Sequence, residues 1–494
     1  MRWRNAEPVD LIGLIGILCG LGLLIWLAFR GWSVLLLAPL AAMVAAFFGG
    51  EPLLAHWTQT FMGGAATFLG QFFPLFLLGA VFGKVMEDSG SVTAIAEFMM
   101  RRLGAERAIL AVVLAGAAVT YGGVSLFVAF FVLAPMARNL FRSADLPRRL
   151  MPAAIILGTS TFTMSALPGT PSIQNAIPMP FFGTTPFAAP GLGVTASAIM
   201  LGFGLWWLGR AARAARQRGE GFGEDAQVPL GGVAAEGQRE RASLAHEFDP
   251  AELLHAEAAA VPPPVTLAAL PLVVVIGVNL GMSLFVLPAL DTSFLAEPRW
   301  GGTALSAVGG VWSVATALTC GILAAIALNR RRIPRLRATI DAGANASVLP
   351  VVSVASLVGF GAVVAAMPAF AAVRDAVLGI GGGPLVSLAV ATNVLAALTG
   401  SASGGLTIAL DALGATYVAR AAEIGLDPGL LHRVAVIGSG TLDTLPHNGA
   451  VVTLLALCGA THRESYRDIV FAGMVGPILA LAAIIGLGSV FGSF

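Results

Sequence analysis

The sequence predicts an all-α membrane protein that crosses the bilayer many times. Of its 494 residues, 57% are hydrophobic and only 11% are charged, whereas a soluble domain carries about 25% charged residues. The mean hydropathy is +0.86. Apolar stretches of about 20 residues, the length of a spanning helix, recur along the chain. A membrane barrel would instead show strands of about ten residues that alternate in polarity.

Ten stretches are long enough to span. They cover 9–29, 32–50, 68–87, 149–185, 190–209, 265–290, 303–328, 348–370, 430–459 and 470–491. The first is too long for the core of a signal peptide and lacks a convincing cleavage site, so we expect a retained helix. Three cysteines, Cys19, Cys320 and Cys458, lie far apart in apolar segments. We expect them to pack in the core and to form neither disulfide nor metal site.

Two further apolar stretches, 107–137 and 384–423, are interrupted near their middle by small and polar residues. Such arms around a Gly/Ser tip predict re-entrant hairpins, which membranes tolerate where they are buried in protein. Prolines break two of the spans: Pro168 and Pro171 in 149–185, and Pro446 in 430–459. Proline removes a backbone donor and clashes with the preceding turn, so helix ends are exposed there.

The two halves of the chain resemble each other. LPGTPS at 167–172 is matched by LPHNGA at 445–450, 278 residues later. Each half has five spans and a hairpin, and an odd number of spans places the second copy upside down. We therefore predict two inverted repeats, 9–209 and 264–494, joined by a polar linker at 210–263.

Arginines predict the orientation. Clusters precede and follow the first hairpin, open the linker, and follow the seventh span at 330–337, all on one side of the inverted-repeat arrangement. The positive-inside rule makes that side, and the linker, cytoplasmic, with both chain ends outside. Arg2 and Arg4 disagree with this orientation. The net charge of +1 gives no reason to expect a nucleic-acid partner.

The hairpin tips and the breaks carry the candidate site. Half-helix ends can bind an anion without any cationic side chain, which suits a chain with one lysine and arginines placed in loops. The expected substrate-binding residues are Tyr121, Gly122, Gly123, Ser125, Thr163, Ser165, Gly169, Thr170, Ser172, Gln174, Asn175, Thr399, Ser401, Ser403, Gly404, Gly405, Thr444, His447 and Asn448. The alternative is that these hydroxyls and amides only make hydrogen bonds between helices.

Asp443 and His447 are the candidate proton-coupling residues. They are four residues apart and share a face if the helix persists that far. Ionisable groups at membrane depth are costly and mostly functional. The alternative is that Asp443 caps a half-helix and His447 makes a structural hydrogen bond. His432 and His462 lie near predicted span ends and are expected at the membrane interface.

Other chemistries find no support. The sequence contains no GxxxxGK[ST] loop for a nucleotide and no HExxH, so we expect neither a cofactor, nor a metal, nor an enzyme. A hydrolase that used Ser439 or His447 would need a partner side chain that the sequence does not supply.

Four segments carry a family resemblance: SGSVTAIAEFM at 89–99, SALPGTPSIQNAIP at 165–178, TGSASGGLTIAL at 399–410 and SGTLDTLPHNGAVVTLLALCGATHRESYRDI at 439–469. They resemble the gluconate permease (GntP) family of bacterial carboxylate symporters, and most of all its 3-hydroxybutyrate-type members. The gluconate-type members carry a His-Pro signature in the first break, where this chain has Leu167-Pro168, which favours a shorter acid.

The resemblance implies a proton-coupled importer of a small hydroxy-carboxylate, driven by the proton gradient. It also implies a multi-pass bacterial inner-membrane protein in contact with lipid, a homodimer, and an elevator-type transport domain that carries both hairpins. Two alternatives remain. One is sodium coupling through backbone carbonyls with Asn448, Thr444 or Ser403; the other is a cation/proton antiporter with no organic substrate.

Overall fold

The computed structural model describes residues 10–28, 30, 32–223, 261–446 and 448–494, and all regular structure in them is helical. Among these described residues, six helices are long and apolar enough to cross a membrane: Leu53–Asp88, Pro190–Gln217, Val265–Ala289, Leu305–Asn329, Leu336–Ala366 and His462–Phe491. The pair Ser91–Leu103 and Ala105–Tyr121, bent by 102°, makes a seventh if it is counted as one span. The prediction of an all-α polytopic membrane protein is confirmed.

The first half of the chain contains a helix pair, a long helix with a short one after it, a hairpin, a broken helix and a final span. These are α1 (Leu11–Ala28), α2 (Val34–Phe48), α3 (Leu53–Ala55), η1 (His56–Phe61), α4 (Met62–Asp88), α5 (Ser91–Leu103), η2 (Ala105–Arg107), α6 (Ala108–Tyr121), α7 (Leu126–Ser143), η3 (Arg148–Leu150), α8 (Met151–Thr159), α9 (Phe162–Ser165), α10 (Ile173–Ala176), α11 (Pro178–Phe182) and α12 (Pro190–Gln217).

The described part of the second half contains the same kinds of element in the same order. These are α14 (Val265–Gly281), η5 (Met282–Val286), α15 (Leu287–Ala289), η6 (Ser293–Ala296), η7 (Pro298–Trp300), α16 (Leu305–Asn329), α17 (Leu336–Ala346), α18 (Val348–Ala366), α19 (Phe370–Leu378), α20 (Gly383–Thr399), α21 (Ala402–Glu423), α22 (Pro428–Thr441), α23 (Gly449–Cys458), α24 (His462–Val470), η8 (Phe471–Val475) and α25 (Gly476–Phe491).

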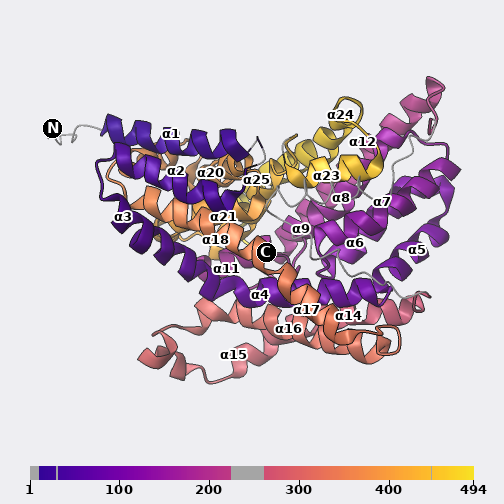
Figure 1. The fold of residues 1–494 in the computed structure, drawn as a ribbon, viewed down its shortest axis with the longest axis horizontal. Coiled ribbons are helices and arrows are strands. Elements are labelled where there is room, and N and C mark those ends of the chain that lie inside the picture. Colours follow the sequence, from indigo (N-terminus) through magenta and orange to yellow (C-terminus); the bar gives the residue numbers. More distant parts are fainter. Residues whose placement is uncertain (1–9, 29, 31, 224–260, 447) are drawn as a thin grey trace.

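The halves interlock through their helix pairs. The α1–α2 pair packs on α18 of the second half through α2, and the α14–α16 pair packs on α4 of the first half through α16, while α4 and α18 pack on each other. Figure 1 shows α1 and α2 above α18, and α14 and α16 below α4. The α1–α2–α18 contact forms an apolar cluster of its own, separate from the main core. The candidate site therefore lies in the larger cluster, which holds the hairpins and broken helices.

Several bounds differ from the sequence-based ones. The span expected at 68–87 begins at Leu53 and passes through a π-helical turn whose Thr58 and Gln59 are polar and exposed. The short helices α5 and α19 were not expected, since the charges of each, such as Arg101 and Asp375, hide a short amphipathic helix from a search for apolar stretches.

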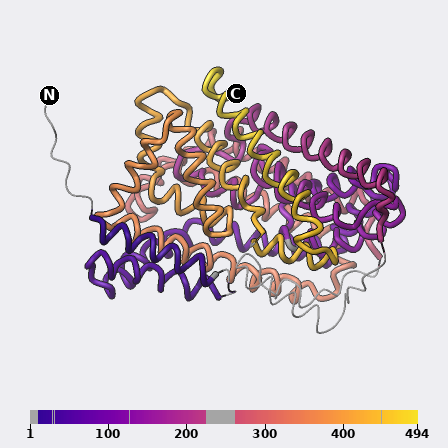
Figure 2. The backbone as a smooth tube through the Cα atoms, turned by 90° about the horizontal axis from the view of Figure 1, so that it is seen from above, coloured from indigo at the N-terminus to yellow at the C-terminus, as the bar shows by residue number. Residues whose placement is uncertain are grey.

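Helix α12 continues into the segment taken as linker, since it runs to Gln217. It lies alongside α25, the last helix of the chain, and Figure 2 shows the two running side by side towards the C-terminus label. Residues 224–260, most of the predicted linker, lie outside the described residues. The cysteine prediction is wrong for Cys19, which is exposed on α1, whereas Cys458 is buried.

Candidate functional site

The first hairpin turns through residues 122–125, between α6 and α7, and contacts the first break directly. The hydroxyl of Tyr121 donates to the carbonyl of Pro168 at 2.7 Å. The hydroxyl of Thr120 donates to that of Thr163 at 3.2 Å. The tip needs Gly123, whose φ is +95°, a conformation that side chains with a Cβ rarely adopt. The tip is therefore held on the break of its own half.

The first break extends from Ser160 to Ser172, with only the single turn of α9 inside it. Gly169 has a φ of +78°, and its backbone nitrogen donates to Pro186 at 2.9 Å while its carbonyl accepts from Asn279 at 3.0 Å. Ser172 begins α10, where its hydroxyl accepts from the backbone nitrogen of Asn175. The backbone groups that the prolines free are thus satisfied by specific partners, as membrane depth requires.

The second hairpin and the second break meet in the same way. Helix α22 ends at Thr441 and α23 begins at Gly449, and the described residues between them, 442–446 and 448, are not helical. The amide of Asn448 donates to the carbonyl of Gly400 at the tip at 3.0 Å and to the Asp443 carboxylate at 3.1 Å, and its oxygen accepts from Ala450 at 2.8 Å. Asn448 therefore connects tip, carboxylate and half-helix.

Asp443, in the second break, lies next to the N-terminal end of α21. Its Oδ1 accepts from the backbone nitrogen of Ala402 at 2.9 Å, in the first turn of that 22-residue helix. Both this N–H and the Asn448 amide stabilise the negative charge of the carboxylate. Because α22 ends before Asp443, the helical face expected to join it to His447 does not exist. His447 itself lies outside the described residues.

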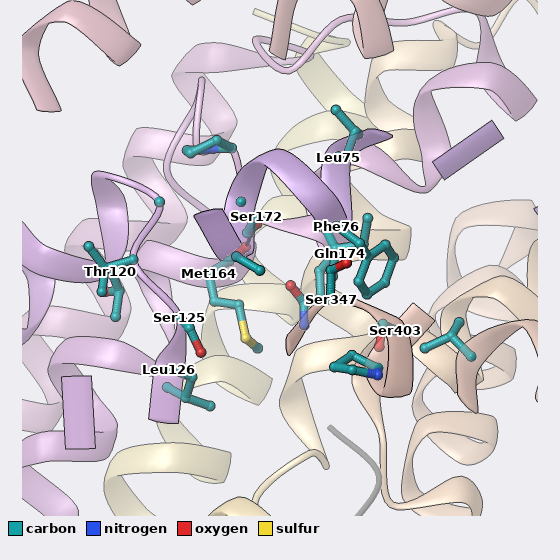
Figure 3. Close-up of a pocket in the computed structure, with 18 of the residues that line it drawn as sticks. Leu75, Phe76, Thr120, Ser125, Leu126, Met164, Ser172, Gln174, Ser347 and Ser403 are labelled. Carbon is teal, nitrogen blue, oxygen red and sulfur yellow. Dashed lines mark hydrogen bonds between the residues drawn. The ribbon is translucent and has the colours of Figure 1, made fainter. Parts of the chain in front are cut away.

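A cavity of about 210 Å³ lies where the two tips and two breaks converge. The first tip contributes Thr120, Gly123 and Ser125, and the first break contributes Ser172 and Gln174. The second half contributes Ser403 at the tip, Asp443 at the break and Ser347 between α17 and α18. Figure 3 shows Ser172, Gln174, Ser347 and Ser403 gathered in this space, with Thr120 and Ser125 on another side. No lysine, arginine or histidine is among the described residues that line it.

The cavity thus holds six of the predicted residues, and the others lie around it. Those that line it are Gly123, Ser125, Ser172, Gln174, Ser403 and Asp443. Those that do not are Tyr121, Gly122, Thr163, Ser165, Gly169, Thr170, Asn175, Thr399, Ser401, Gly404, Gly405, Thr444 and Asn448. Most of this second group make hydrogen bonds to backbone: Ser165 donates to Thr161 at 3.0 Å and Thr399 to Leu395 at 2.8 Å.

Three of the four predicted glycines beyond the cavity serve close packing. A Cβ on Gly405 would lie 2.2 Å from the backbone nitrogen of Ala396, so the glycine lets the hairpin arms α20 and α21 touch. A Cβ on Gly404 would lie 2.5 Å from the Leu357 side chain, and one on Gly122 would lie 2.2 Å from that of Leu272. These glycines seat the tips against α18 and α14.

Arg433 was missed, and the expectation that arginines stay in loops is wrong. It lies on α22, is fully buried, and donates to the carbonyl of Ala188 at 2.7 Å, to that of Ser165 at 3.4 Å and to Asn175 Oδ1 at 3.3 Å. None of these bonds goes to a carboxylate. The polar acceptors around the first break, including the predicted Asn175, are the one sequence signal that could have found it.

His432, the residue before Arg433, is also fully buried. Its Nδ1 lies 2.6 Å from the Thr184 hydroxyl and its Nε2 lies 3.1 Å from Asn175 Oδ1. Asn175 completes its bonds by donating to the carbonyls of Thr170 and Pro186, both at 3.0 Å. This pair from the second half therefore holds the first break in place.

A second charged cluster lies one helical turn from the cavity. Lys84 Nζ lies 3.2 Å from Glu87 and 3.1 Å from Asp88, and Thr339 of α17 donates to Asp88 at 2.7 Å. Ala80, one turn before Lys84 on α4, lines the cavity. The cluster sets two carboxylates against one ammonium, with Lys84 and Asp88 buried. The sequence pattern KxxED on an apolar helix is a signal that points to it.

Helical hairpins and broken helices that meet at one internal cavity, within an all-helical membrane fold, are typical of membrane transport proteins. A family pattern described as GntP family permease matches residues 11–179. The chain is 40% identical to "Uncharacterized transporter YxjC" of Bacillus subtilis, over 97% of this chain and 99% of that one. The chain belongs to the GntP permease family, and is a transporter and not an enzyme.

Two further proteins show a weaker similarity, one in part of its sequence and one in its fold. The high-affinity gluconate transporter of Escherichia coli is 28% identical over 173 residues, which are 34% of this chain and 38% of that one. The structure of Neisseria gonorrhoeae MtrF, described within a class of antimetabolite efflux pumps, superposes with a TM-score of 0.52 over 89% of this chain and 85% of that chain. At 13% identity this likeness concerns the fold alone.

Proposed function

We propose that the protein imports a small hydroxy-carboxylate by proton symport, with 3-hydroxybutyrate-like acids as the preferred class and gluconate-like acids next. One observation carries the proposal: both hairpin tips and both breaks converge on one largely apolar cavity, whose polar lining residues are hydroxyls, an amide and one carboxylate. Its volume of about 210 Å³ suits a short acid. Membership of the permease family and the likeness to a gluconate transporter support a carboxylate substrate.

The hydroxyls and helix ends supply the recognition. Helix α7 begins at the cavity, where its N-cap Ser125 and first residue Leu126 both line the wall. The positive end of this 18-residue helix favours a carboxylate. The hydroxyls of Thr120, Ser172 and Ser403 can accept a hydrogen bond from a hydroxyl of the substrate.

Asp443 supplies the coupling. An organic anion in the cavity and an ionised Asp443 repel each other, so binding of the substrate and binding of a proton to Asp443 favour each other. Without substrate, the Ala402 N–H and the Asn448 amide hold the ionised form. This linkage yields symport, since the proton and the acid load together and leave together.

The repeated order of elements supports the remaining parts of the proposal. The two halves form inverted repeats, 9–209 and 264–494, and the linker at 210–263 is cytoplasmic. The hairpins and broken helices move as an elevator against the α1–α2 and α14–α16 pairs, which pack on the long helices α18 and α4. The protein works as a homodimer in a bacterial inner membrane.

Uptake into proteoliposomes tests the substrate and the coupling. We expect radiolabelled 3-hydroxybutyrate to accumulate when the lumen is alkaline, and a protonophore to abolish accumulation. Unlabelled acids from lactate to gluconate should compete, with the short hydroxy acids strongest. Accumulation that followed a sodium gradient at equal pH would contradict proton coupling. Proton-for-sodium exchange in the absence of any organic acid would contradict the substrate class.

A further inference from the structure

A second cavity, of about 440 Å³, opens where the ends of α12 and α24 meet the turn before α8. Five arginines line it together with Trp207: Arg149, Arg210, Arg218, Arg463 and Arg467. None of its lining residues belongs to the cavity between the tips and breaks. It is thus a separate site, and its charge needs an explanation.

The carboxylates near it are already engaged. Asp468 accepts from Arg149 and, at 3.0 Å, from the Trp207 ring nitrogen. Glu464 accepts from the backbone nitrogen and the hydroxyl of Thr461, each at 3.0 Å, in the capping box of α24. Both acids therefore stabilise the walls of the cavity.

Glu220 is the third acid at this site. It binds Arg149 at 2.6 Å and Arg218 at 3.1 Å. Five arginines against three carboxylates leave a charge of 5 − 3 = +2. Arg210 and Arg463 are exposed and form no ion pair with any described residue, and Arg467 lies over the Trp207 ring at 5.6 Å. The excess charge is therefore concentrated on guanidinium groups with donors to spare.

The cavity lies at the edge of the apolar zone. Most of the residues that line it come from the polar ends of two segments that are long enough to span, Pro190–Gln217 and His462–Phe491. Trp206, one turn before Arg210, is 54% exposed and lies 5.5 Å from the Phe203 ring. Exposed tryptophan at the end of a span is typical of the membrane–water interface. An amphiphile could place its tail along this aromatic surface and its head among the arginines.

We propose that this arginine cavity binds a phosphate group, supplied by the headgroup of an anionic phospholipid. Guanidinium groups bind phosphate oxygens through paired N–H donors, and basic pockets between membrane helices bind anionic headgroups. Free inorganic phosphate offers the same chemistry without the tail. The lipid would hold α12, α24 and the start of α8 together, so it stabilises the fold.

Thermal unfolding of the purified full chain in a neutral detergent tests this. We expect phosphatidylglycerol, and not phosphatidylcholine, to raise the unfolding midpoint. In the double variant Arg210→Gln/Arg463→Gln the lipid concentration for half-maximal protection should rise about 25-fold, about fivefold for each charge. The control Arg330→Gln/Arg331→Gln removes two exposed arginines at the end of α16 and should respond like the natural protein.

The remaining outcomes decide the source and the site. Protection by millimolar inorganic phosphate alone, lost in Arg210→Gln/Arg463→Gln, would assign the site to a free anion. Equal lipid protection in that variant and in the control, or none in the natural protein, would overturn the proposal. If the double variant does not fold, Arg210→Lys/Arg463→Lys, which keeps the charge and loses the paired donors, should bind phosphatidylglycerol more weakly than the control.

Discussion

The two tip-and-break pairs share one backbone design and differ in their charges. In the first half, neutral groups make the contact: the Tyr121 hydroxyl to the Pro168 carbonyl, and the Thr120 hydroxyl to that of Thr163. In the second half, an amide and a carboxylate do so, through Asn448 and Asp443. Only the second pair places a titratable group at the cavity among the residues that the structure describes.

The charge next to the first tip-and-break pair comes from a residue of the other half of the chain. Arg433, from α22 of the second half, is buried against the carbonyls of Ser165 and Ala188. A positive charge next to the first break and a negative charge at the second make the electrostatic potential of the cavity asymmetric. In our proposal the substrate anion is attracted to the first half, and the proton binds at the second. Substitutions on each side should therefore affect different steps.

The largest effect is expected at Arg433. Arg433→Met leaves the buried carbonyls of Ala188 and Ser165 without the guanidinium donor, which should cost about 3 kcal/mol or more of folding stability. Thermal unfolding in detergent measures this. Arg433→Lys keeps the charge but loses the forked donors, and should fall in between.

Arg420→Met is the matched control for Arg433→Met. Arg420 is exposed on α21 and makes one bond, to the carbonyl of Leu378, so its loss should change stability by about 0.5 kcal/mol or less. If Arg433→Met unfolded at the temperature of Arg420→Met, Arg433 would not hold the first break.

Asp443→Asn should separate transport from accumulation. The amide oxygen of asparagine can still accept from the Ala402 N–H, so the tip should keep its place, but the residue can no longer take up a proton. Exchange of labelled for unlabelled acid should continue, whereas accumulation driven by a pH gradient should fall to that of protein-free vesicles. Undiminished accumulation would remove Asp443 from the coupling step.

The sequence predicted the hairpin tips and the breaks, which polar residues and prolines mark, but it did not predict the contacts between segments that are distant in the chain. Pro168, Pro171 and Pro446 do lie in the two breaks, whereas Pro39, Pro74, Pro135 and Pro271 stand inside helices, so proline marks a break only together with the polar residues around it. Gly405 was predicted as a substrate-binding residue at the second tip, whereas its close contact with Ala396 depends on how α20 and α21 pack. Periodicity along one helix cannot show which partner a side chain meets.

Arg433 shows this limit most clearly. A cation near the start of an apolar segment is typical of a membrane surface, and only folding brings Asn175 and Ala188 to it from 258 and 245 positions away. The short helices α5 and α19 were missed for a related reason. Their charges lower the hydropathy, although one face of α5 is buried.

Removing the hydrogen bonds of each tip should give a smaller, graded effect. Asn448→Ala removes three bonds of the second tip and break, at a cost of about 2 kcal/mol, whereas Tyr121→Phe removes one bond of the first, at about 1 kcal/mol. Chemical unfolding of both variants compares them. A larger loss for Tyr121→Phe would reverse the order, and would mean that the neutral contact is the stronger one.

The smallest effect is expected at Glu220, a carboxylate beside the arginine cavity that has no part in the proposed proton coupling. A hydrogen bond from Arg149 lowers the pKa of Glu220, with help from Arg218. Because the folded pKa lies below the unfolded one, this stability is present above the unfolded pKa and is lost as the pH falls through the folded pKa. Glu220 is partly exposed, so solvent screening limits the contribution to about 1 kcal/mol or less.

Glu220→Gln should therefore lower the unfolding midpoint slightly at neutral pH and should flatten its fall in acid, while proton-driven uptake keeps its natural pH profile. Asp443→Asn should do the reverse, changing the uptake profile more than the midpoint. Parallel pH series of unfolding and uptake on the two variants separate the role of Asp443 in transport from the role of Glu220 in stability. If Glu220→Gln shifted the uptake profile as strongly as Asp443→Asn, proton coupling would not be confined to the second break.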